Sequence, residues 1–161
     1  MNIAEWNSEI MHFIQLAEKY KVRMLMVGGG AVNFHGYQRS SADIDFWIDT
    51  NASNLANLIA VFNEMGYQID SFPEEVQNSQ QNISVKFSPK DLELELITKF
   101  DLDKTFDEAF QNAENIQIGD QQVLKWKVLS LDDLIANKLK SARPKDILDI
   151  QQLQRIRNEQ K

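Results

Sequence analysis

The sequence predicts an α+β fold, with a mixed β-sheet of four to six short strands and helices before, between and after them. Short apolar runs bounded by turn residues alternate with longer segments in which apolar residues recur at helical spacing. The 161 residues suit a single domain, residues 1–161, with a core of its own.

The expected helices follow from apolar spacing and from residues that begin or end helices. Residues 2–20 and 54–65 are amphipathic, and Gly66 is placed to end the second of these segments. Ser130 suits an N-cap, and Pro144 suits the first position of a helix. The expected helices span residues 2–20, 30–35, 54–65, 104–112, the segment after Ser130 and the segment from Pro144.

The expected strands are short apolar runs or alternating apolar and polar residues. Residues 92–96 alternate leucine with glutamate, as in a strand with one buried face. A turn at residues 88–91 predicts that this strand forms a hairpin with the preceding one. Residues 72–81 are polar and are expected to form a loop. The expected strands span residues 22–27, 42–48, 83–87, 92–96 and two short segments within 116–128.

One stretch, residues 27–48, combines a glycine turn with two acidic residues. Four of the six glycines lie between Gly28 and Gly36, where backbone N–H groups can approach an anion closely. Asp43 and Asp45 follow in an apolar strand, and their spacing of two points both side chains to one face. A carboxylate in an apolar strand is unfavourable unless it is paired or binds a metal. The stretch therefore predicts a site for a phosphate-bearing ligand and a divalent cation.

Together these motifs resemble the polymerase-β-like nucleotidyltransferase superfamily, in which a glycine pair opens a helix and Asp-x-Asp follows on the next strand. The string GGxA, followed by G-x-x-R-x-S/T-x-D-I-D, is similar to a small stand-alone bacterial branch related to abortive-infection (AbiEii-type) nucleotidyltransferase toxins. The matching residues are Gly28, Gly29, Ala31, Gly36, Arg39, Ser41, Asp43, Ile44 and Asp45, with Lys138, Arg143, Lys145, Asp146 and Asp149 in the tail.

The resemblance implies transfer of a nucleoside monophosphate from a nucleoside triphosphate, such as ATP, to an acceptor hydroxyl, with release of pyrophosphate. It implies that Asp43 and Asp45 bind Mg²⁺ or Mn²⁺ and that a third carboxylate completes the catalytic and metal site. The matching position is Glu95, where the family most often has aspartate. The alternative is that Glu95 simply lies on the solvent-exposed face of an amphipathic strand.

The resemblance also implies that Gly28, Gly29, Arg39, Ser41 and Lys138 bind the nucleotide. Each position has an alternative: a plain turn for the glycines, an ion pair for Arg39, turn hydrogen bonds for Ser41 and a surface location for Lys138. For the acidic and basic residues around Asp146, an ion-pair network within the helix is the alternative to a functional role.

Composition limits the compartment and the partners. The chain has no cysteine, which fits a reducing compartment, and no signal peptide or membrane-spanning run, so a cytoplasmic location is expected. The net charge of −7 argues against broad nucleic-acid binding. The segment from Lys125 onward is nevertheless basic, with nine Lys/Arg and five Asp/Glu. The expected partners are a nucleoside triphosphate, an acceptor (tRNA, another RNA end, a protein or a small molecule), and a cognate antitoxin or a second copy. The alternative is a catalytically degenerate nucleotide- or partner-binding module on the same fold.

Overall fold

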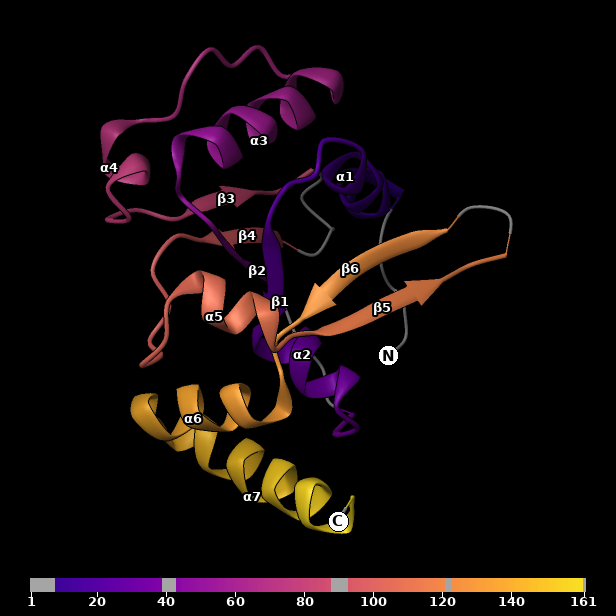
Figure 1. The fold of residues 1–161 in the computed structure, drawn as a ribbon, viewed down its shortest axis with the longest axis vertical. Coiled ribbons are helices and arrows are strands. Elements are labelled where there is room, and N and C mark those ends of the chain that lie inside the picture. The colour runs from indigo at the N-terminus through magenta and orange to yellow at the C-terminus, as the bar shows by residue number, and fades with distance from the viewer. Residues whose placement is uncertain (1–7, 39–42, 88–92, 121–122, 161) are drawn as a thin grey trace.

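A computed structural model describes residues 8–38, 43–87, 93–120 and 123–160. It contains one six-stranded mixed sheet with the order β3-β4-β2-β1-β6-β5 (Figure 1). The strands are β1 (Met24–Val27), β2 (Asp43–Ile48), β3 (Ile83–Val85), β4 (Glu93–Ile97), β5 (Glu114–Ile118) and β6 (Leu124–Val128). The helices are α1 (Ser8–Lys19), α2 (Gly28–Phe34), α3 (Ala52–Glu64), α4 (Glu74–Gln77), α5 (Phe106–Gln111), α6 (Leu131–Ser141) and α7 (Pro144–Glu159). The predicted α+β fold with a mixed sheet is confirmed.

Strand β2 lies in the middle of the sheet and sets the register of the acidic residues. It pairs antiparallel with β1, where Val27 lies opposite Asp45. On its other side it pairs parallel with β4, where Asp45 lies opposite Glu95. Residues that lie opposite each other on paired strands point to the same face of the sheet. The register therefore places carboxylates from β2 and β4 side by side.

The two faces of β2 have different surroundings. Phe46 points to the core, where its ring lies 6.4 Å from that of Phe13 in α1, and Phe13 lies 5.7 Å from Phe62 in α3. On the opposite face, the ring of Trp47 lies 5.1 Å from both Phe100 and Phe106. The aspartates share this second face but lie toward the start of β2. One end of this face is therefore packed with aromatic rings, and the other end carries the acidic residues.

The helix boundaries follow the predicted capping residues. Ser130 accepts a hydrogen bond from the N–H of Asp133 at the start of α6, and Pro144 begins α7. Gly66, with φ +104°, lies directly after Met65, the C-cap residue of α3, as expected. The helix expected over residues 30–35 begins earlier, at Gly28.

The expected loop over residues 72–81 is wrong in part, because it contains the short helix α4. Val76 in this helix is only 2% exposed. Phe72 in the same segment is also buried, at 8% exposed, so this polar segment packs against the core through two apolar side chains.

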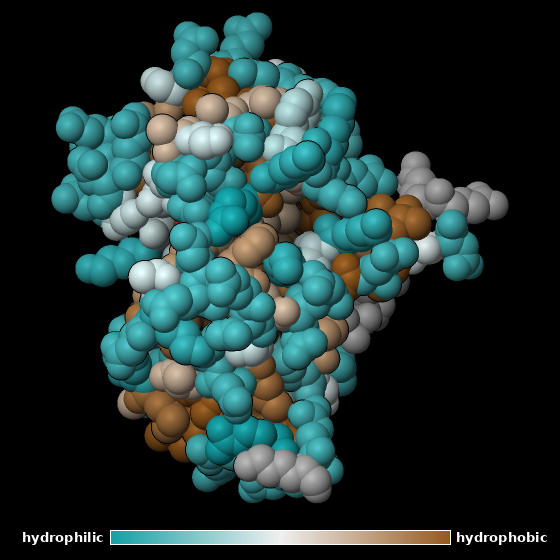
Figure 2. All heavy atoms as spheres, in the orientation of Figure 1, coloured by the Kyte–Doolittle hydropathy of each residue, from teal (hydrophilic) through white to brown (hydrophobic). Residues whose placement is uncertain are grey.

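Helices α6 and α7 lie side by side beyond one end of the sheet (Figure 1). Leu139, Ile147 and Leu148 in these helices are each about half exposed, and Figure 2 shows apolar surface gathered at this end of the molecule. No helix in the described part of the chain is long and apolar enough to cross a membrane.

Candidate functional site

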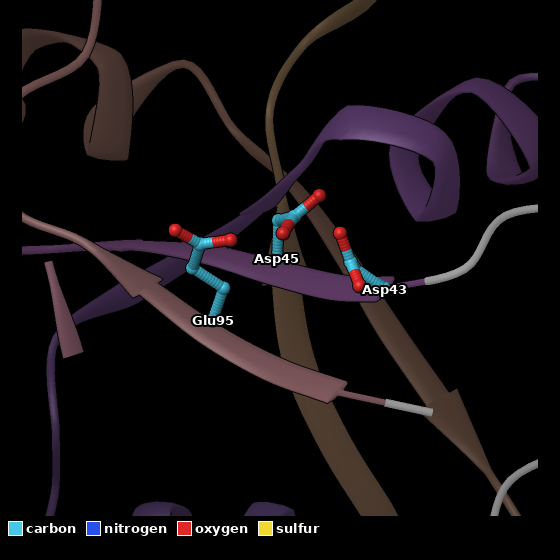
Figure 3. Close-up of side chains that lie close together, drawn as sticks. All are labelled: Asp43, Asp45 and Glu95. Carbon is cyan, nitrogen blue, oxygen red and sulfur yellow. The ribbon is translucent and has the colours of Figure 1, made fainter. Parts of the chain in front are cut away.

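The structure brings together the three carboxylates that the sequence predicts as a metal site. Asp43, Asp45 and Glu95 each offer one carboxylate oxygen, and these oxygens lie within 4.8 Å of one another (Figure 3). The spacing of two in β2 and the parallel register with β4 account for this arrangement. Oxygen ligands at this separation suit a hard divalent cation such as Mg²⁺ or Mn²⁺.

Burial and the neighbouring carboxylate charges change the ionisation of Asp45. Burial, followed by the charges of Asp43, Glu95 and Glu93, raises the pKa of Asp45 to about 7, while the charge of Lys145 acts in the opposite direction. The cluster therefore resists full ionisation at neutral pH unless a counter-charge is added. A divalent cation between the carboxylates would supply that charge, so the donor set fits a metal in electrostatics as well as in ligand type.

Gly28 lies directly against this cluster. Its φ of +63° is a left-handed conformation, and a Cβ added there would stand 2.5 Å from Oδ2 of Asp45. The position therefore requires glycine for its backbone conformation and for the space that Asp45 occupies. Val27, which precedes it, makes no side-chain capping bond, so the first N–H groups of α2 face this region without a side-chain cap.

Of the other predicted nucleotide-binding residues, Gly29 is buried in the first turn of α2 next to Gly28. Arg39 and Ser41 lie outside the described residues. The side chain of Lys138 in α6 is 6% exposed and forms ion pairs with two aspartates of α7. The expectation that these residues bind a nucleotide stays a prediction.

Lys138 forms a buried ion cluster with two aspartates of α7. Its Nζ lies 3.0 Å from Asp149 and 3.4 Å from Asp146. Burial by itself would raise the pKa of Asp146, but hydrogen bonds from Arg143 and the charges of Lys138 and Arg143 bring this pKa below its ordinary value. The ion pairs thus bridge two helices, in addition to the predicted pairing within α7 between Arg143 and Asp146 at 2.8 Å.

Replacing Lys138 by methionine should lower the free energy of unfolding by about 3 kcal/mol, because two buried aspartates would lose a cation. Lys140→Met is the matched control in the same helix, since Lys140 pairs with the exposed Asp103 and should cost less than about 1 kcal/mol. Urea unfolding of both variants measures the difference. Equal losses would show that the buried cluster does not hold α7 in place.

Two further residues act on the carboxylates. The charge of Lys145, whose role the sequence left open, acts on Asp45 from the start of α7. Asn82 donates a hydrogen bond from Nδ2 to Oε1 of Glu95 over 3.3 Å. Asn82 has no local sequence signal, because it reaches Glu95 through tertiary packing, whereas Lys145 matches the tail motif but its effect on Asp45 also depends on packing. A separate groove of about 860 Å³, between α1 and the β5–β6 hairpin, contains none of the three carboxylates.

Several solved structures are similar to this chain. One is described as an antigenic nucleotidyltransferase-like protein from Paracoccidioides brasiliensis, with 17% identity, a TM-score of 0.53, and coverage of 92% of this chain and 77% of that chain. Another is described as ANT(2″)-Ia in complex with adenylyl-2″-tobramycin, with 14% identity, a TM-score of 0.50, and coverage of 94% of each chain. At these identities the likeness establishes the fold.

No curated protein sequence matches the chain. One protein family does match, over residues 7–161, and this range includes all three carboxylates and the glycine turn. The acidic cluster on β2 and β4 is consistent with a nucleotidyltransferase catalytic site. The chain therefore belongs to the family described as nucleotidyl transferase of unknown function (DUF2204).

Proposed function

We propose that the protein transfers a nucleoside monophosphate from a nucleoside triphosphate to an acceptor hydroxyl, with Asp43, Asp45 and Glu95 as the catalytic and metal-binding residues. The observation that carries this proposal is the convergence of the three carboxylate oxygens within 4.8 Å. Their position beside Gly28 supports it, because phosphates and the cation that accompanies them need adjacent binding groups.

In the proposed reaction, the acceptor oxygen forms a bond to the α-phosphorus of the triphosphate. The bond from the α-phosphorus to the oxygen bridging to the β-phosphate breaks, and its electron pair leaves on pyrophosphate. The hydroxyl proton passes to a carboxylate of the cluster and then to solvent. Bound Mg²⁺ or Mn²⁺ would offset phosphate charge during this transfer. The protein's contribution is to place the reacting groups and to stabilise charge.

We assign the phosphates to the backbone N–H groups of Gly28 and Gly29 and to the side chains of Arg39 and Ser41. The uncapped start of α2 supports the glycine part of this assignment. Lys138 is buried against Asp146 and Asp149, which supports a role in joining α6 and α7. We propose that Lys138 holds α7 in position, and its contact with the nucleotide stays a prediction.

The acceptor and the biological role are proposed from weaker observations. ANT(2″)-Ia is in complex with adenylyl-2″-tobramycin, an adenylylated small molecule, which supports a small-molecule hydroxyl as one candidate acceptor beside RNA and protein. The motif string supports a relation to the abortive-infection toxins. On that relation a cognate antitoxin is the proposed protein partner.

Incubation of the protein with a bacterial cell extract and each α-labelled nucleoside triphosphate tests the proposed activity. We expect label in one of the RNA, protein or small-molecule fractions, only with Mg²⁺ or Mn²⁺, and none with Asp43→Asn. Metal-dependent nucleotide binding without label in any fraction would instead establish a binding module. Absence of both binding and transfer would refute the proposed function.

A further inference from the structure

Asn82 lies where it can control the direction of the Glu95 side chain. It directly precedes β3, and its Nδ2 donates a hydrogen bond to Oε1 of Glu95 over 3.3 Å. Strand β4 lies between β3 and β2 in the sheet, so Asn82 approaches Glu95 from the side opposite the two aspartates. We infer that Asn82 is a positioning residue that holds the Glu95 carboxylate toward Asp43 and Asp45 for cation binding, an inference that rests on the proposed function.

The side-chain amide of Asn82 is itself held by Thr98, directly after β4. The backbone N–H of Thr98 donates to Oδ1 of Asn82 over 3.0 Å, and the Thr98 hydroxyl lies 3.4 Å from the same oxygen. A backbone N–H only donates, so the atom of Asn82 that faces it must be the oxygen. The amide nitrogen is then left to face Glu95, and the orientation of the amide follows from its partners.

Thr98 is in turn anchored in the structure. It is 5% exposed, and its hydroxyl donates to the carbonyl of Gln81 over 3.0 Å. The chain of contacts therefore runs from a buried residue through Asn82 to a half-buried carboxylate. Supports of this kind, one step behind the metal ligands, set ligand orientation and affect metal affinity.

The length of the Glu95 side chain explains why such a support matters. Glutamate has one more rotatable bond than aspartate, so fixing its carboxylate costs more conformational entropy. Figure 3 shows the Glu95 carboxylate turned toward Asp45 from the neighbouring strand. A hydrogen bond from Asn82 restricts the Glu95 side chain before the cation binds. Less conformational entropy is then lost on binding.

The inference can be tested by titrating Mn²⁺ and following free Mn²⁺ by electron paramagnetic resonance, with a non-hydrolysable triphosphate present. Asn82→Ala should weaken Mn²⁺ binding about 10-fold. Ser84→Ala is the matched control, because Ser84 lies opposite Glu95 in the β3–β4 ladder, and it should bind Mn²⁺ as the wild type does.

A double-mutant cycle separates positioning from a structural effect. The shorter side chain in Glu95→Asp withdraws the carboxylate from Asn82, so Asn82→Ala should cause little further loss in that background. The inference is overturned if Asn82→Ala binds Mn²⁺ like the wild type, or if it causes the same loss in both backgrounds. Failure of the wild type to bind Mn²⁺ would refute the proposed function and the inference with it.

Discussion

Replacing Asp45 by asparagine should abolish nucleotidyl transfer and at the same time stabilise the metal-free protein at neutral and alkaline pH. Loss of a central carboxylate should lower the transfer rate by about 10³-fold or more, because charge stabilisation is the main task of such a site. The same carboxylate is half-buried, and this burial, together with the charges of Asp43, Glu95 and Glu93, raises its pKa to about 7. Replacing the charge should therefore relieve both its desolvation and its repulsion from the other carboxylates in the folded state.

The sign of the pH dependence follows from linkage. Between the ordinary pKa of 3.8 and about 7, folded Asp45 keeps a proton that the unfolded chain has released. The free energy of unfolding contributed by Asp45 therefore falls as pH rises through this window. The gain in stability from Asp45→Asn should grow from about pH 4 to pH 7, up to about 1–3 kcal/mol after allowance for partial exposure.

Urea unfolding at pH 5 and pH 8 in the presence of a chelator measures this gain. Asp70→Asn, at an exposed carboxylate outside the cluster, is the control and should show no such pH-dependent gain. Added Mg²⁺ should stabilise the wild type and leave Asp45→Asn unchanged. If the asparagine variant were equally or less stable at pH 8, Asp45 would not be under the repulsion described here.

Gly28→Ala should reduce transfer by at least about 100-fold, because its methyl group would fall 2.5 Å from Oδ2 of Asp45 and displace that carboxylate. It should also cost about 1 kcal/mol or more of stability through the positive φ. Gly66→Ala is a closely matched control, since Gly66 has φ +104° and no atom within 4 Å of the added Cβ.

Steady-state kinetics and thermal unfolding of the two glycine variants separate strain from displacement. Both alanine variants should lose stability, but only Gly28→Ala should lose activity and Mn²⁺ affinity. Full activity in Gly28→Ala would show that the close approach of Gly28 to Asp45 has no catalytic importance.

The elements that determine the site were largely predictable from the sequence because their signals are local. The alternation of leucine and glutamate over residues 92–96 predicts that Glu95 points to the polar face of its strand. The spacing of two between Asp43 and Asp45 predicts that both aspartates share one face of theirs. Strong capping and turn residues, such as Ser130 and Pro144, located the helix starts. Local signals of this kind do not depend on which strands are neighbours in the sheet.

The remaining features depend on packing between distant segments. Lys138 looks like a surface lysine on its own helix, and only the arrival of α7 buries it against Asp146 and Asp149. The contact between Asn82 and Glu95 depends on the antiparallel register of β3 and β4. No property of residue 82 alone distinguishes it from the other polar residues around it.

The pairing of β2 with β4 determines when the cluster can form during synthesis. About fifty residues, including α3, α4 and β3, separate the first aspartate from Glu95. A nascent chain therefore holds only two of the three ligands until β4 has left the ribosome and docked beside β2. Cation binding by all three carboxylates should for this reason follow the docking of β4 beside β2.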